Sequence, residues 1–190
     1  IATARYARES GLPYFGICYG LHMAAIEFAR NVVGLANANS TEIDPETPFP
    51  VIDYMPNQKG VDMGGTMRLG LWPCYLEPGT RARAAYGEPN ISERHRHRFE
   101  VNNEFRPAFD AAGLISSGTS RDGQLVEIME LEGHPFYLGV QFHPEFRSRP
   151  NRPHPIFRDF VGAALERLPE GAQRALPIAT EMAAEAVIAD

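Results

Sequence analysis

The segment Pro13-Tyr14-Phe15-Gly16-Ile17-Cys18-Tyr19-Gly20 carries the strongest structural signal of the chain. Residues 13–17 form a short apolar run between turn residues, which is typical of a buried β-strand. Apolar side chains then recur at helical spacing, at Leu21, Ala24, Ala25, Phe28 and Ala29. The sequence therefore predicts a strand, a sharp turn at Cys18 and a helix.

Cys18 lies between two small residues, Gly16 and Gly20, in the pattern of a nucleophile elbow. Such a turn is tight and strained, so it favours small flanking residues, and it projects its central side chain clear of the sheet. A helix N-terminus also favours the thiolate, the reactive form of cysteine. A lone cysteine after a strand is more often a small buried apolar residue, and for Cys74 we expect only that role.

A cysteine nucleophile needs a base that is held by a third group. The candidates are His22, His95, His97, His134, His143 and His154. His143 follows the apolar run 136–142, a predicted strand, and Glu145 lies two residues further on. Residues separated by one position in an extended segment point the same way, so Glu145 is positioned to orient the imidazole of His143.

The remaining patterns predict a three-layer α/β domain with added hairpins. We expect helices over 1–10, 105–112 and 155–168, strands ending near 76 and over 96–101, 125–131 and 136–142, and a loop over 36–60. The predicted apolar stripe of the 155–168 helix comprises Phe157, Phe160, Val161, Ala164, Leu165 and Leu168. Residues 1–168 are the predicted domain, and 169–190 a C-terminal tail.

Composition limits the class of protein. The 190 residues are 44% hydrophobic, which suits one globular domain. No apolar run approaches the ~18 residues that span a bilayer, and two cysteines suit a reducing compartment, so we expect a cytoplasmic protein with no membrane partner. The net charge of −6 argues against general nucleic-acid binding.

The run Arg94-His95-Arg96-His97-Arg98 has several interpretations. In a strand, the arginines would share one face and the histidines the other. That pattern fits a surface strand paired with acidic neighbours, a nucleic-acid patch, or a metal site at His95 and His97. The acidic net charge and the missing interleaved aromatic residues argue against the nucleic-acid patch, and the lack of a matching cysteine or carboxylate cluster nearby argues against the metal site, so the surface strand is favoured.

Several strings together resemble the class I (triad) glutamine amidotransferase family, and within it the glutaminase domains of the CTP synthases. The strings are 16–20, 26–31, 37–42, 64–70, 93–102 and 142–145. The resemblance covers residues 1–168 and implies a three-layer, flavodoxin-like or Rossmann-like fold. It also implies that strands and a glycine-rich loop precede residue 1, so that the domain is truncated at its N-terminus.

The resemblance implies a role for individual residues. Cys18 would be the nucleophile, His143 the base and Glu145 its orienting partner. Tyr19, His22, Glu42 and Arg98 would bind L-glutamine; a carboxylate accepts from an ammonium, and a guanidinium grips a carboxylate through two parallel hydrogen bonds. From its own neighbours Ser40 and Thr41, Glu42 is alternatively a helix-cap element.

The implied reaction is hydrolysis of glutamine through a cysteine thioester, which supplies ammonia for the ATP-dependent amination of UTP to CTP. No cofactor would bind in this domain; ATP and Mg would bind in a synthetase domain of the same parent chain, which would be a homo-oligomer. The 64–70 segment resembles the lid loop that is associated with activation by GTP.

Two features depart from the family pattern. His22 stands where the family has glutamine, and Tyr19 where it has leucine, so we expect weakened or altered glutamine binding. A non-catalytic amidotransferase-like module that binds without turnover is the alternative function.

Overall fold

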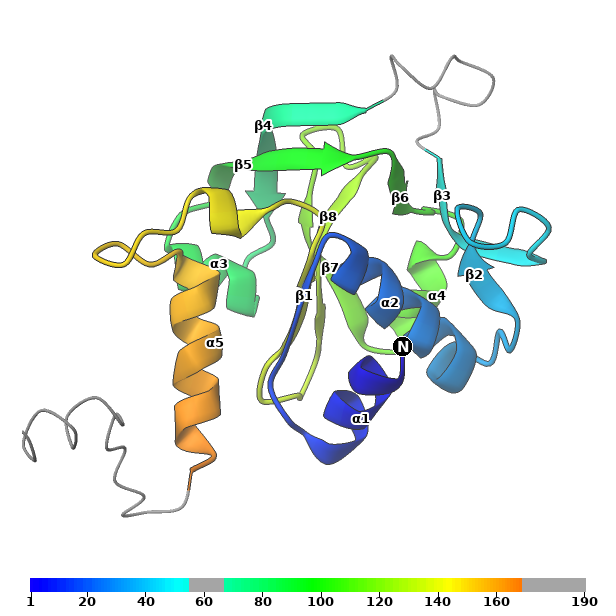
Figure 1. Cartoon of the computed structure of the whole chain (residues 1–190), viewed down its shortest axis with the longest axis horizontal. Coiled ribbons are helices and arrows are strands. Elements are labelled where there is room, and N and C mark those ends of the chain that lie inside the picture. Colours follow the sequence, from blue (N-terminus) through cyan, green and yellow to red (C-terminus); the bar gives the residue numbers. More distant parts are fainter. Residues whose placement is uncertain (55–66, 169–190) are drawn as a thin grey trace, which may run out of the picture.

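A computed structural model describes residues 1–54 and 67–168, in which helices and strands alternate along much of the chain (Figure 1). The strands are β1 (Tyr14–Ile17), β2 (Ala38–Ser40), β3 (Phe49–Tyr54), β4 (Arg68–Leu76), β5 (Asn90–His97), β6 (Phe99–Val101), β7 (Leu114–Thr119), β8 (Val126–Leu131) and β9 (Tyr137–Val140). The helices are α1 (Ala2–Ser10), α2 (Tyr19–Phe28), η1 (Ala29–Val33), α3 (Arg81–Tyr86), α4 (Arg106–Ala111), η3 (Pro144–Phe146) and α5 (Pro155–Glu166).

The described strands form two sheets. The larger has the order β1-β9-β8-β7-β4-β5 and the smaller β2-β3-β6. Helices α1, α2 and α4 lie on one side of the larger sheet, and α3 and α5 on the other (Figure 1). Each side has its own apolar core, one including Leu21 and Phe109 and the other including Ala82 and Ile156. The predicted three-layer α/β architecture is confirmed.

The pairing of β1 with β9 positions the elbow. These strands are parallel, with Ile17 opposite Val140, whereas the other described neighbours in this sheet are antiparallel. Cys18 donates its backbone N–H to the Val140 carbonyl at 2.7 Å. Because parallel strands end at the same edge of a sheet, the residues after Ile17 and after Val140 emerge side by side, although 123 positions separate them.

The buried Glu27 joins α1 to α2. Its two carboxylate oxygens accept from Arg8 Nε at 2.9 Å and Nη2 at 2.7 Å. The Glu27 side chain has no exposed surface, so these charge-assisted hydrogen bonds compensate its burial. The presence of a charged residue at position 27, within the segment 26–31 that resembles the family, is therefore explained by this contact between the two helices.

The expected loop over 36–60 is wrong for residues 38–40 and 49–54, whereas residues 41–48 are turns and irregular structure as predicted. Residues 38–40 and 49–54 are β2 and β3, and Val51 and Ile52 are completely buried against α2. Prolines suggested a loop, but two of them lie in the turn between these strands and Pro50 lies near the start of β3, where a missing N–H is tolerated. Helix α3 and strand β7 were not predicted, and the strand expected over 96–101 is two strands, β5 and β6.

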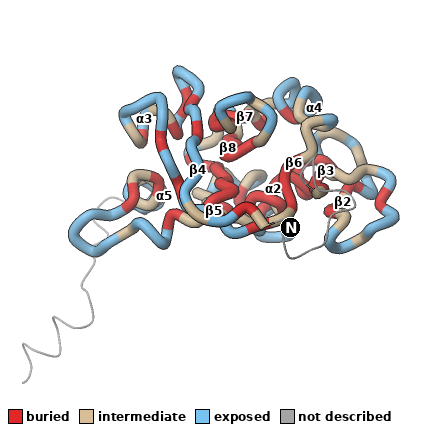
Figure 2. The backbone as a smooth tube through the Cα atoms, turned by 90° about the horizontal axis from the view of Figure 1, so that it is seen from above, coloured by how far each residue is buried: buried red, intermediate tan, exposed pale blue. Residues whose placement is uncertain are grey.

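Helix α5 is confirmed, but its predicted buried face is partly wrong. The buried positions are Ile156 and Ala163, with Phe160 partly buried. Val161 and Leu165 are exposed, as is Leu168 after the helix. Ile156, Phe160 and Ala163 are four and three residues apart and so share one face; the α5 ribbon lies at the outside of the molecule, and only one side of it is buried (Figure 2).

The tail predicted over 169–190 and residues 64–66 of the predicted lid loop lie outside the described residues. Within residues 1–54 and 67–168, no helix has both the length and the apolar character that a bilayer span requires.

Candidate active site

The turn at Cys18 has the geometry of an elbow. Cys18 has φ 49° and ψ −100°, and it is the one described non-glycine residue with a positive φ. Backbone strain of this kind, about 1–3 kcal/mol, is found at functional sites. A Cβ at Gly16 would lie 2.6 Å from the backbone carbon of Gly20. The small residue before the nucleophile is therefore a requirement of the turn.

The expectation that Gly20 must also be small is wrong. A Cβ there would meet no atom closer than Tyr14 Oη, at 3.8 Å, which is ordinary van der Waals contact. Gly20 lies in the first turn of α2, and the space beside its Cα can hold a methyl group. Tyr14 Oη donates to the Gly20 carbonyl at 2.7 Å, and this contact involves only the backbone of Gly20.

The Cys18 thiol is protonated in its present surroundings. Burial raises its pKa to about 11, and the backbone N–H of Tyr19 and the Gln141 side chain oppose that shift only in part. The Tyr19 N–H at the start of α2 lowers the thiol pKa, as expected at a helix N-terminus, but the loss of hydration outweighs this effect. A nucleophile with this pKa needs a base.

Gln141 belongs to this site, although the sequence did not indicate it. Its Nε2 lies 3.7 Å from Cys18 Sγ, and its Oε1 is 3.0 Å from His22 Nε2. Gln141 directly follows β9 and is completely buried, and no local pattern of the sequence indicates a site residue there.

His143 and Glu145 form the predicted pair. His143 Nδ1 lies 2.7 Å from Glu145 Oε1, and the His143 backbone N–H donates to the Arg94 carbonyl at 2.8 Å. Both residues follow β9, whose parallel neighbour β1 leads into Cys18. The Glu145 charge acts electrostatically on the Cys18 thiol. The three predicted catalytic residues thus follow neighbouring strands at the same edge of the sheet.

A cavity of about 220 Å³ opens at Cys18. It is lined by Cys18, Tyr19, His22, Glu42, Met67, Arg96, His97, Arg98 and Phe99. All four residues predicted to bind glutamine are therefore at the cavity that contains Cys18. Met67, Arg96 and Phe99 were not predicted as site residues, and His97 was considered only as a candidate base or metal ligand.

Glu42 and Arg98 bring opposite charges to this cavity. Neither forms an ion pair with a residue of the described ranges, so both are available to a ligand that carries an ammonium and a carboxylate. Glu42 lies in a turn in which its N–H donates to Ser40 Oγ at 3.1 Å. The alternative that Glu42 caps a helix is wrong, because no helix begins there.

His22 is a buried, neutral residue. Its side chain is 3% exposed, and burial lowers its pKa to about 4, against the effect of the hydrogen bond that Nε2–H donates to Gln141 Oε1. The imidazole therefore carries no charge near neutral pH, which limits its role at the cavity to hydrogen bonding and shape.

This depressed pKa predicts an acid-sensitive stability. The unfolded chain protonates His22 at about pH 6.5, but the native state does so only at about pH 4. As pH falls between these values, the unfolded state binds more protons, so the free energy of unfolding decreases. We expect His22→Gln to flatten this decrease by up to about 1.4 kcal/mol per pH unit, measured by urea unfolding. Parallel curves for both proteins would contradict this prediction.

The alternation predicted for β5 is confirmed. Arg94 and Arg96 are exposed, and His95 and His97 are buried. His95 Nδ1 and His97 Nε2 are 2.8 Å apart, beside a buried ion pair in which Arg68 bonds to Glu127 at 3.0 and 2.5 Å. The strand is thus a surface strand on one side only. The described residues contain no group of side chains arranged to hold a metal ion.

Comparison with known proteins gives a consistent result. A family model described as glutamine amidotransferase class-I matches residues 1–163. The CTP synthase of Thermomicrobium roseum is 68% identical over 181 residues, 95% of this chain and 33% of that protein. The CTP synthase of Rubrobacter xylanophilus is 63% identical over 179 residues, 94% of this chain and 32% of that protein. The chain thus spans about a third of these curated relatives.

A solved structure supports the same relationship. The glutaminase domain of Trypanosoma brucei CTPS with bound acivicin matches with a TM-score of 0.81 and 35% sequence identity. The match covers 93% of this chain and 69% of that structure.

Proposed function

Because the chain belongs to the class I glutamine amidotransferases, as a glutaminase domain of the CTP synthase type, we propose that it hydrolyses L-glutamine through a thioester at Cys18. The observation that carries this proposal is the common cavity of Cys18, Glu42 and Arg98. It presents a sulfur nucleophile together with one negative and one positive charge, neither of which forms an ion pair with another residue of 1–54 or 67–168.

The proposed reaction has two steps. In the first, His143 takes the thiol proton while Cys18 Sγ attacks the side-chain amide carbon of glutamine. The same imidazole gives that proton to the departing nitrogen, so ammonia leaves and a γ-glutamyl thioester remains. In the second, His143 deprotonates water, which attacks the thioester and releases glutamate and the thiol. Glu145 holds the imidazole and stabilises its positive form, which the 2.7 Å contact with Nδ1 supports.

The two charged residues of the cavity suit the main-chain end of a free amino acid. Glu42 would accept from the ammonium, and Arg98 would bind the carboxylate. Tyr19 is the residue after the nucleophile, and its backbone N–H already forms a hydrogen bond with the Cys18 sulfur. In the reaction this N–H would donate to the oxyanion of the tetrahedral intermediate.

The ammonia would serve a larger reaction. We propose that a synthetase part of the same parent chain uses it, with ATP and Mg, to aminate UTP to CTP, and that GTP activates the glutaminase. The identity to CTP synthases that are about three times the length of this chain supports this proposal.

Covalent labelling distinguishes the enzyme from a binding module without turnover. The protein as its gene encodes it is incubated with a chloroketone analogue of glutamine, and the modified residue is identified by mass spectrometry. We expect one label per chain at Cys18, no label in Cys18→Ala, and none at Cys74, which is completely buried. Absence of labelling together with measurable glutamine binding would instead support the binding module.

The replacement of the family's glutamine by His22 predicts a kinetic effect. We expect His22→Gln to lower KM for glutamine about three- to tenfold, the range that one hydrogen bond supplies. Because His22 does not touch the reacting atoms in the proposed steps, kcat should stay within about twofold. Steady-state glutaminase assays measure both constants. His134→Gln is the control, because His134 bonds to the Ala7 carbonyl, away from the cavity lining; an unchanged KM in His22→Gln would contradict the prediction.

A further inference from the structure

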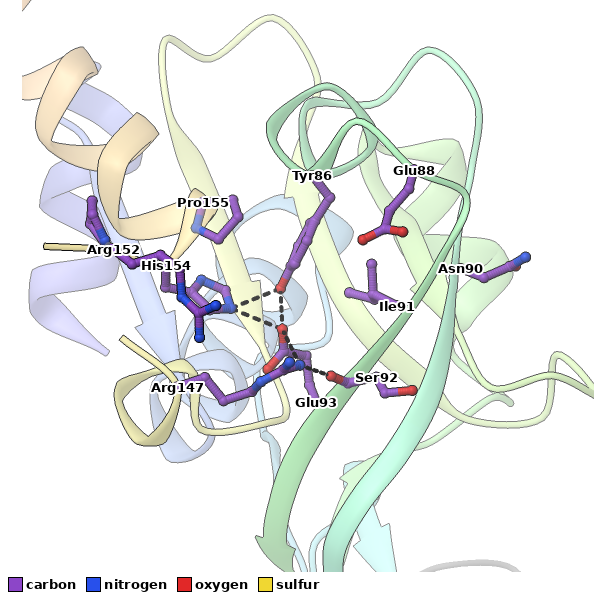
Figure 3. Close-up of a pocket in the computed structure, with 11 residues that line it drawn as sticks. Tyr86, Glu88, Asn90, Ile91, Ser92, Glu93, Arg147, Arg152, His154 and Pro155 are labelled. Atoms are coloured by element: carbon purple, nitrogen blue, oxygen red, sulfur yellow. Dashed lines mark hydrogen bonds and ion pairs between the residues drawn. The ribbon is translucent and has the colours of Figure 1, made fainter. Parts of the chain in front are cut away.

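A second polar cluster lies outside the Cys18 cavity, around the buried carboxylate of Glu93. The side chain of Glu93 is 2% exposed. Glu93 Oε1 accepts from Tyr86 Oη at 2.9 Å and from His154 Nε2 at 2.9 Å, and it lies 3.6 Å from Arg147 Nη1. Figure 3 shows these side chains converging on one carboxylate oxygen. We call these four residues the Glu93 cluster.

The hydrogen bonds of the Glu93 cluster determine the tautomer of His154. The Ile156 backbone N–H donates to His154 Nδ1 at 3.4 Å, so Nδ1 accepts and the proton is on Nε2, which donates to Glu93. His154 thus links the N-terminus of α5 to β5. One carboxylate therefore binds residues from three parts of the chain: α3, the segment after η3, and the start of α5.

The Glu93 cluster is continuous with the His143–Glu145 pair. Arg147, two residues after Glu145, also donates to the Ser92 carbonyl. His143 donates its N–H to the Arg94 carbonyl. Three consecutive residues of β5 therefore hold both ends of the five-residue segment 143–147.

Segment 143–147 has its own short-range hydrogen bonds. The Phe146 N–H donates to the His143 carbonyl at 3.2 Å, and the Arg147 N–H to the Pro144 carbonyl at 3.0 Å. The segment is therefore a compact turn, and we expect a displacement at Arg147 to move Glu145 and His143 as well.

We propose that Glu93 is a positioning residue for His143 and Glu145. Through Arg147 it holds the segment that carries both side chains against β5, and so sets their position relative to Cys18. This inference rests on the proposed function. A displacement of about 1 Å at a reacting group costs about 100-fold in rate, so the predicted effect is on turnover.

The surroundings of Glu93 make the test practicable. The Glu93 cluster borders a cavity of about 380 Å³, which Glu88, Asn90 and Arg152 also line (Figure 3). Water from this cavity can satisfy Tyr86 and His154 when the carboxylate is removed, so we expect Glu93→Ala to fold. Glu88 is exposed and lines the same cavity, which makes Glu88→Ala a matched control.

The experiment measures kcat and KM for glutamine in the protein as its gene encodes it. We expect Glu93→Ala to lower kcat about 100-fold, with KM within about threefold because Glu42 and Arg98 are not in segment 143–147. Glu93→Gln should recover part of the loss, since its amide oxygen still accepts from Tyr86 and His154. Arg147→Ala should lower kcat about tenfold, and Glu88→Ala should match the wild type. Thermal unfolding establishes that each variant is folded at the assay temperature.

The outcomes separate this inference from the proposed function. If the wild type neither turns over glutamine nor is labelled at Cys18, both are overturned. If the wild type is active and folded Glu93→Ala keeps kcat within threefold, or loses only KM, the positioning role alone is overturned. If Glu93→Ala does not fold, Glu93→Gln and Arg147→Ala decide: wild-type kcat in both overturns the proposal, and a reduced kcat at unchanged KM supports it.

Discussion

Replacement of His143 by alanine is expected to lower kcat for glutamine hydrolysis about 10³- to 10⁴-fold, with KM nearly unchanged. The reason is the protonation state of the nucleophile. With a thiol pKa of about 11, only about one molecule in 10³ carries a thiolate near pH 8. Without the imidazole, the reaction depends on that small fraction, and ammonia also leaves without a proton donor.

The same variant should have a diagnostic pH dependence. Once the base is absent, its residual activity should increase about tenfold per pH unit as the Cys18 thiol itself ionises, and should level off only near the thiol pKa of about 11. Steady-state rates between about pH 7 and 10 test this. The increase follows from the sign of the shift: burial favours the protonated thiol, so higher pH is needed to form the thiolate.

His134→Ala is the matched control for His143→Ala. His134 lies in the turn before β9, whereas His143 lies after that strand. The Nε2 of His134 forms a hydrogen bond with the Ala7 carbonyl at 3.1 Å. We expect kcat of this variant within about twofold of the wild type. A His143→Ala enzyme that retained a tenth or more of wild-type turnover would exclude His143 as the base.

The parts of this site that local sequence could predict are those that depend on neighbouring residues. A strand, a tight turn and a helix around Cys18 follow from the order of apolar residues and glycines, and the His143–Glu145 contact follows from a spacing of two. The meeting of these two segments rests on the parallel pairing of β1 with β9. Only the family resemblance indicated that the two segments meet, because local periodicity does not show which strands pair.

The pKa of Cys18 shows why local reasoning also fails. Position at a helix N-terminus lowers the pKa of a thiol, and the Tyr19 N–H has that effect here. Burial acts in the opposite direction and is larger, but it depends on the whole fold and cannot be deduced from residues 16–20. Gln141 was missed for the same reason, since it contacts Cys18 and His22 only through tertiary structure.

The assignment of Glu42 and Arg98 came from family resemblance. Glu42 follows β2 in the small sheet, and Arg98 lies between β5 of the large sheet and β6 of the small sheet. No periodicity of the sequence relates these positions. Their common cavity is a property of how the two sheets meet, which only the three-dimensional structure shows.

Alanine substitutions at the two glycines of the elbow should have opposite results. A Cβ at Gly16 would lie 2.6, 2.7 and 2.9 Å from the Gly20 carbon, the Gly20 oxygen and the Leu21 nitrogen. These are backbone atoms, so no change of rotamer relieves the overlap, and the start of α2 must move away from β1. We expect Gly16→Ala to lose about 3 kcal/mol of unfolding free energy and, in protein that remains folded, about 100-fold in kcat because Cys18 moves with α2.

Gly20→Ala introduces the same methyl group four residues later, in the first turn of α2, where the nearest atom is 3.8 Å away. There alanine favours the helix over glycine by up to about 1 kcal/mol, so stability should be unchanged or slightly increased. Urea unfolding of both variants measures the difference, which we expect to be about 3–4 kcal/mol. Equal free energies of unfolding would mean that the first turn of α2 does not lie against β1 as described, and the strained position of Cys18 would then lose its structural basis.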